Sequence, residues 1–166
     1  LLNLNQNFKT CLPFVPLKTR YQWLEKSADI YQQLNISASA NVYKYLTNQS
    51  EAGETLSANE KSTIYKQLGT AEKYLVDHAK ALYLEKFYIG EGEYTFTCNP
   101  QYDLDIFAPH LEKSDQLYLQ QIRKEYTGQN YILDAGLSIS FDEVANRLLF
   151  WENFNTQYPK NHFHTD

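Results

Sequence analysis

The sequence predicts a mostly α-helical protein: one compact domain of five or six helices, arranged as a bundle or as an array of helical hairpins. A short extended or β-hairpin insert is expected around residues 93–107. Three observations predict this class. A chain of 166 residues is long enough for one hydrophobic core. Apolar side chains recur at three- and four-residue spacing over long runs, and two Ser-x-x-Glu motifs have the pattern of helix capping boxes. We therefore expect residues 1–166 to form a single domain.

The N-terminal third is predicted to hold an irregular arm and two helices. Residues 1–17 contain Pro13 and Pro16, which disfavour a continuous helix, so we expect an arm without regular structure. Helical spacing begins at Lys18, with Tyr21, Leu24, Ala28, Tyr31 and Leu34 on one face. A weaker helix is expected over about residues 38–49.

The middle of the chain is predicted to hold a long helix followed by the extended insert. Ser57 and Glu60 form the first capping box, and apolar spacing continues from there to about Tyr88, with a bend expected at Gly69. Residues 93–109 then alternate apolar and polar side chains, which is the period of a strand. A small hairpin turning at Asn99-Pro100 would fit this pattern.

Two more helices are expected in the last third, one from Asp115 to about Tyr126 and one through to Tyr158. The second capping box, Ser140 to Glu143, opens the last helix. Residues 160–166 are expected to be a flexible tail.

The last helix carries a local resemblance. The pattern Ala145-x-x-Leu148-x-x-Trp151-x-x-Phe154-x-x-x-Tyr158-Pro159 resembles the second helix and Tyr-Pro exit of tetratricopeptide-like units in bacterial envelope scaffolds. It covers about 15 residues, and no 34-residue repeat is visible upstream. The resemblance implies a helical interaction module.

Composition favours a protein that binds another protein. The chain has 14 Tyr, 9 Phe and 2 Trp and a formal net charge of −5. Its 15 Lys and Arg form no basic stripe, which argues against a nucleic-acid or anionic-membrane partner. Tyr and Trp are frequent at interaction hot spots. We expect a non-enzymatic binding module, such as an inhibitor or immunity-type protein, whose contact residues are Tyr43, Tyr102, Tyr118 and Trp151.

The alternative is a small metal-dependent or acid/base hydrolase that uses Asp103, Asp105, His110 and Glu112. On a strand, Asp103 and Asp105 would lie on one face about 7 Å apart, and paired carboxylates can divide acid and base duties. No motif for a cofactor or a metal centre accompanies them, so we expect neither. A carrier of a small ligand is a third possibility, since an aromatic-rich helical protein can enclose a cavity.

The two cysteines bear on localisation. Cys11 and Cys98 lie close to prolines in predicted non-helical segments and could form a disulfide in an oxidising compartment. The chain also begins without methionine, which would fit removal of a signal peptide. We therefore expect a periplasmic or secreted protein of bacterial type.

Overall fold

The computed structural model describes residues 1–36, 39–48, 54–90, 93–127, 132–133 and 136–163. These residues are mostly helical, as the sequence predicts, although they form eight α-helices rather than five or six. The α-helices are α1 (Leu2–Cys11), α2 (Leu17–Ile36), α3 (Ala40–Thr47), α4 (Ala58–Gln67), α5 (Thr70–His78), α6 (Gln101–Ile106), α7 (Lys113–Glu125) and α8 (Phe141–Gln157). The described residues also form two 3-10 helices, η1 (Leu12–Phe14) and η2 (Ala108–His110). Two antiparallel ribbons complete the fold. In the first, β1 (Leu84–Gly90) pairs with β2 (Glu93–Cys98), and in the second, β3 (Ile132–Leu133) pairs with β4 (Gly136–Leu137).

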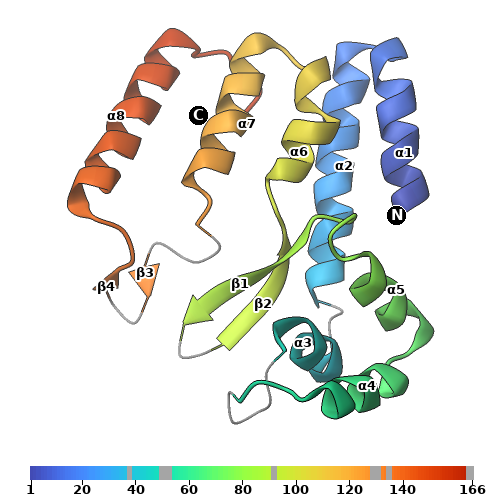
Figure 1. Cartoon of the computed structure of the whole chain (residues 1–166). Helices are drawn as coiled ribbons and strands as arrows, with labels where there is room; N and C mark the ends of the chain where they lie inside the picture. The colour runs from blue at the N-terminus through green and yellow to red at the C-terminus, as the bar shows by residue number, and fades with distance from the viewer. Residues whose placement is uncertain (37–38, 49–53, 91–92, 128–131, 134–135, 164–166) are drawn as a thin grey trace.

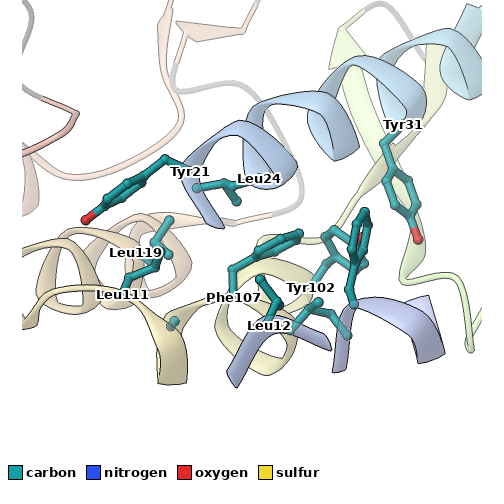
Figure 2. Close-up of a cluster of buried hydrophobic side chains, with 11 residues drawn as sticks. Leu12, Tyr21, Leu24, Tyr31, Tyr102, Phe107, Leu111 and Leu119 are labelled. Atoms are coloured by element: carbon teal, nitrogen blue, oxygen red, sulfur yellow. The ribbon is translucent and has the colours of Figure 1, made fainter. Parts of the chain in front are cut away.

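Five helices stand side by side in the order α8, α7, α6, α2 and α1, and the remaining helices lie beyond the β1–β2 ribbon (Figure 1). The main core forms where α1, α2, α6 and α7 meet, and side chains from all four point into it (Figure 2). A smaller core under α3, α4 and α5 is built on Val42, Leu68 and Val76. The helix α8 stands at the outer edge of the row.

The N-terminal segment is helical, so the expectation of an irregular arm is wrong. Pro13 occupies the first turn of η1, where a helix needs no backbone N–H donor, and α1 ends before it at Cys11. Phe8 and Leu12 anchor this segment in the main core.

The long helix predicted up to Tyr88 ends at His78, and residues 84–90 form a strand instead. The turns that follow α5 close at Tyr83, which adopts a left-handed conformation with φ of 56° just before β1 begins. Its hydroxyl donates to Asp105 at 2.7 Å and its ring packs edge-on against Tyr102. Gly69 is a full break rather than a bend, since it caps the N-terminus of α5.

The extended insert exists, but it spans residues 84–98 rather than 93–107. In the β1–β2 ribbon Leu84 pairs with Cys98 and Phe87 with Thr95. The second predicted arm is the helix α6, which Asn99 starts by accepting a hydrogen bond from the Gln101 amide at 2.8 Å. Tyr102 and Ile106, four residues apart, are buried on one side of this helix, so its apolar residues satisfy the helical period as well.

Candidate functional site

The helix α8 begins after the predicted N-cap, Ser140, but only one arm of the predicted capping box forms. The hydroxyl of Ser140 accepts from the Glu143 amide at 3.1 Å, which satisfies one of the orphan donors of the first turn. The carboxylate of Glu143 turns along the helix and pairs with Arg147 at 2.8 Å. The helix ends at Gln157, one residue before the predicted limit.

One side of α8 is held against α7 by a cluster of aromatic rings and a buried carboxylate. Tyr118 of α7 packs against Trp151 and Phe154, with ring centroids 5.2 and 6.1 Å apart. The buried carboxylate of Glu125 accepts from the indole N–H of Trp151 at 3.3 Å, while its backbone carbonyl accepts from Arg147 at 3.2 Å. These contacts fix which face of α8 is turned away from the protein.

The outward face of α8 is apolar over its first two turns. Phe141 is 81% exposed and Leu148 is 59% exposed, and helical spacing places them on the same side of the helix. The ribbon β3–β4 precedes this end of α8, and its paired residues Ile132 and Leu137 are exposed too (Figure 1). We call this surface the α8 patch; its large apolar residues are Ile132, Leu137, Phe141, Val144, Leu148 and Leu149.

The α8 patch is large for a surface left open to water. Of the seven large apolar residues that are exposed in the described part of the chain, all except Phe14 belong to it, whereas exposed apolar residues on a monomer are ordinarily scattered singly. Apart from the Glu143–Arg147 ion pair, the charged residues of α8 are both acidic, Asp142 and Glu152. Its chemistry is an apolar stripe with an acidic rim.

The segment after α8 is packed rather than a flexible tail, over the residues that the structure describes. Asp115, 0% exposed in the first turn of α7, accepts from the Asn161 side chain at 2.5 Å and from the His162 amide at 3.1 Å. The Tyr21 hydroxyl of α2 donates to the same carboxylate. Phe163 then stacks on Tyr118 at 4.4 Å. Asp115 therefore joins α2, α7 and the C-terminal segment, whereas residues 164–166 lie outside the described part.

The four aromatic residues expected to bind a partner are partly or wholly buried. Tyr102 is 2% exposed and belongs to the main core, so it cannot form a contact surface. Tyr118 and Trp151 are half-buried in the aromatic cluster of α7 and α8. Tyr43 is half-buried and packs edge-on against Phe96. Their rings stabilise the fold, and the exposed apolar surface lies on other residues.

The acidic and histidine residues do not meet as the hydrolase hypothesis requires. On the helix α6 the directions of Asp103 and Asp105 differ by about 200°, so they do not share a face. Asp105 is exposed and accepts from Tyr83 and from Gln101. Glu112 is exposed at the start of α7, and the backbone carbonyl of His110 accepts from Arg20 at 2.7 Å. Across the described residues, no group of three or more His, Cys, Asp or Glu side chains could hold a metal ion.

Cys11 and Cys98 are both free thiols, so the expected disulfide is not formed. Cys11 is the exposed last residue of α1, whereas Cys98 ends β2 and is half-buried beside α2 and α6. Burial raises the pKa of the Cys98 thiol well above its usual range. The expectation of a periplasmic or secreted protein loses its main support with this disulfide.

Cavities open between the helices of the described part of the chain, and two of them are lined by titratable side chains. The larger, about 630 Å³, lies between α1 and the α5–β1 turn and is lined by charges of both signs, those of Lys9, Lys80 and Asp77. The smaller, about 360 Å³, lies between α2, the β2–α6 junction and α7, and Asp103 lines it. Burial raises the pKa of the Asp103 carboxyl from 3.8 to about 6. Asp103 belongs to the residues of the hydrolase hypothesis, but that hypothesis places it on a strand, whereas it lies on the helix α6.

Asp103→Asn is expected to raise the free energy of unfolding at pH 7 by about 2 to 3 kcal/mol. Because the folded-state pKa is raised, the wild-type carboxyl contributes stability below pH 3.8 that is lost as the pH rises through about 6. Asparagine removes that charge, so the gain seen in urea unfolding at pH 7 should vanish near pH 4. Asp105→Asn, two residues away on the exposed side, should give no such gain. A less stable Asp103→Asn variant at pH 7 would contradict this account of the carboxyl.

Comparison with protein-family models, with curated proteins and with solved structures finds no match for this chain. Among the described residues, no helix is both long and apolar enough to cross a membrane. The geometry of the site therefore carries the functional argument.

Proposed function

We propose that this chain is a non-enzymatic protein-binding module whose partner docks on the α8 patch. The observation that supports this most strongly is the outward face of α8, where Phe141, Val144 and Leu148 form an exposed apolar stripe. An exposed stripe of this size is typical of a surface that another molecule covers. An inhibitor or immunity-type protein is one specific form of the proposal.

The partner we propose is an amphipathic helix with basic residues beside its apolar face. The stripe follows the three- and four-residue spacing that pairs one helix with another. Asp142 and Glu152 flank it, so Lys or Arg on the docking helix would find opposite charges there. Since α8 stands at the edge of the row, a further helix can approach it without displacing one already in place (Figure 1).

A second copy of this chain fits the α8 patch less well. In a two-fold symmetric pair the same surface is used twice, so the acidic rims of both copies would meet. Sedimentation equilibrium at micromolar concentration should therefore give a monomer, and a stable dimer would contradict this choice of partner.

A synthetic peptide tests the proposal. The probe is a labelled 18-residue helix with Leu at core positions and Lys on the flanks, followed by fluorescence anisotropy. Leu148→Asp is expected to weaken its binding about tenfold or more, because a carboxylate replaces a central apolar contact. Phe14→Ser is the matched control, since Phe14 is 86% exposed on η1, outside the patch.

The charges of the probe provide the second arm of this experiment. A peptide with Glu in place of Lys should bind more weakly, and salt should weaken the Lys peptide, because rim charges are screened. Equal binding by wild type and Leu148→Asp, or equal binding of the Lys and Glu peptides, would overturn the proposed docking site.

A further inference from the structure

The two carboxylate oxygens of Asp115 have different partners. Oδ2 accepts from the Tyr21 hydroxyl, and this bond joins α7 to α2. Oδ1 accepts from the Asn161 side chain at 2.5 Å and from the His162 amide at 3.1 Å, both in the C-terminal segment. Because a buried carboxylate oxygen without donors is costly, Oδ1 requires N–H groups from whichever segment covers it.

The next two residues of the C-terminal segment stack their rings on α2 and α7. His162 lies over Tyr21 with ring centroids 3.9 Å apart, and its Nε2 atom is 3.2 Å from the carboxylate of Glu25. The ring of Phe163 lies almost parallel to that of Tyr118, with centroids 4.4 Å apart. Three consecutive side chains of the segment therefore each have a partner of their own. We call the surface that they contact the α2–α7 site; it consists of Tyr21, Glu25, Asp115 and Tyr118.

The main core positions the walls of the α2–α7 site. Tyr21 of α2 belongs to that core, and so do Leu111 and Leu119, which flank Asp115 in the sequence (Figure 2). The C-terminal segment adds Phe163 at the margin of the core. Because packing within the core fixes α2 and α7, we expect the site to keep its shape when the segment leaves it.

We propose that the α2–α7 site is a peptide-binding site, and that the chain's own C-terminal segment occupies it as a built-in ligand. The recognised pattern is Asn-x-Phe: the Asn supplies N–H donors to Oδ1 of Asp115, and the ring stacks on Tyr118. The spacing follows from a turn in which the Asn161 carboxamide oxygen accepts from the Phe163 amide at 2.8 Å. A segment of another protein with this pattern reproduces each contact and so can displace the built-in ligand.

A peptide with the sequence of residues 158–163, acetylated and amidated, is the probe, titrated into the ¹⁵N-labelled full chain. The seated segment competes with it in the wild type, because a tethered ligand has an effective concentration on the order of millimolar. Phe163→Ala removes the stacked ring of the seated segment, and Asn161→Asp places a second carboxylate beside Asp115. Both variants should bind the peptide about tenfold more tightly than the wild type does. The indole signal of Trp23, which packs against the main core, shows that each variant is folded.

Two control peptides keep the length of the probe and change one contact each, with Asp in place of Asn or Ala in place of Phe. Each should bind the two variants about tenfold more weakly than the matched peptide, since one lacks the side-chain donor and the other the ring. Equal affinity of the matched and control peptides, equal affinity of the wild type and both variants, or no saturable shifts in either folded variant overturns the proposal. None of the four residues of the α2–α7 site belongs to the α8 patch, so this result is independent of the docking site proposed there.

Discussion

Replacing Asp115 by alanine is expected to lower the free energy of unfolding by about 3 to 5 kcal/mol. The carboxylate is fully buried and accepts from the Tyr21 hydroxyl, the Asn161 side chain and the His162 amide. Alanine would leave three donors without an acceptor in a site that water does not reach. Urea unfolding at pH 7, monitored by circular dichroism, measures the loss.

Asp142→Ala is the matched control, because Asp142 also lies in the first turn of a helix but is exposed. Its interaction with the helix dipole is worth at most about 1 kcal/mol. Asp115→Asn should lie between the two variants, since the amide keeps one acceptor oxygen. A loss below about 1 kcal/mol for Asp115→Ala would show that this carboxylate does not join the three segments.

Phe107→Ala is expected to cost a similar amount, about 3 to 5 kcal/mol. Phe107 is 0% exposed at the centre of the main core, and its ring centroid lies 5.3 Å from that of Phe8 and 5.9 Å from that of Tyr102 (Figure 2). Removing the ring leaves a cavity that α1 and α6 cannot close without moving. The midpoint and slope of urea unfolding give the change.

Phe14→Ala is the control for Phe107→Ala, because Phe14 is exposed and its truncation removes little buried apolar surface. Its effect should stay within about 0.5 kcal/mol, as for most exposed positions. Equal losses for Phe14→Ala and Phe107→Ala would mean that the core is not centred on α1, α2, α6 and α7.

The fold class could be predicted from the sequence because most helices carry local signals. Ser57 forms both arms of its capping box, and Ser140 caps α8 as predicted. Elements decided by distant contacts were less predictable. Tyr83, at the turn between α5 and β1, contacts Asp105 and Tyr102, about twenty residues away, and local spacing alone continued the predicted helix past His78.

The candidate site was less predictable than the fold. Apolar spacing in α8 places Val144, Leu148, Trp151 and Tyr158 on one stripe, but the structure half-buries Trp151 and Tyr158 and leaves Val144 and Leu148 exposed. A signal was available, since apolar residues extend over more of the helix surface than one neighbouring helix can cover. Periodicity shows which face of a helix is apolar, but it does not show whether the same chain or a partner covers that face. A helix face at an interface therefore has the same sequence pattern as one in the core.

The most direct test of the central claim is to map the basic helical peptide onto the full chain by amide chemical-shift perturbation. Shifts are expected in residues 141–149 of α8 and at Ile132 and Leu137, and the amides around Phe14 should not move. Shifts confined to other elements, or no shifts at concentrations that saturate the anisotropy signal, would contradict the assignment of the α8 patch as the docking surface.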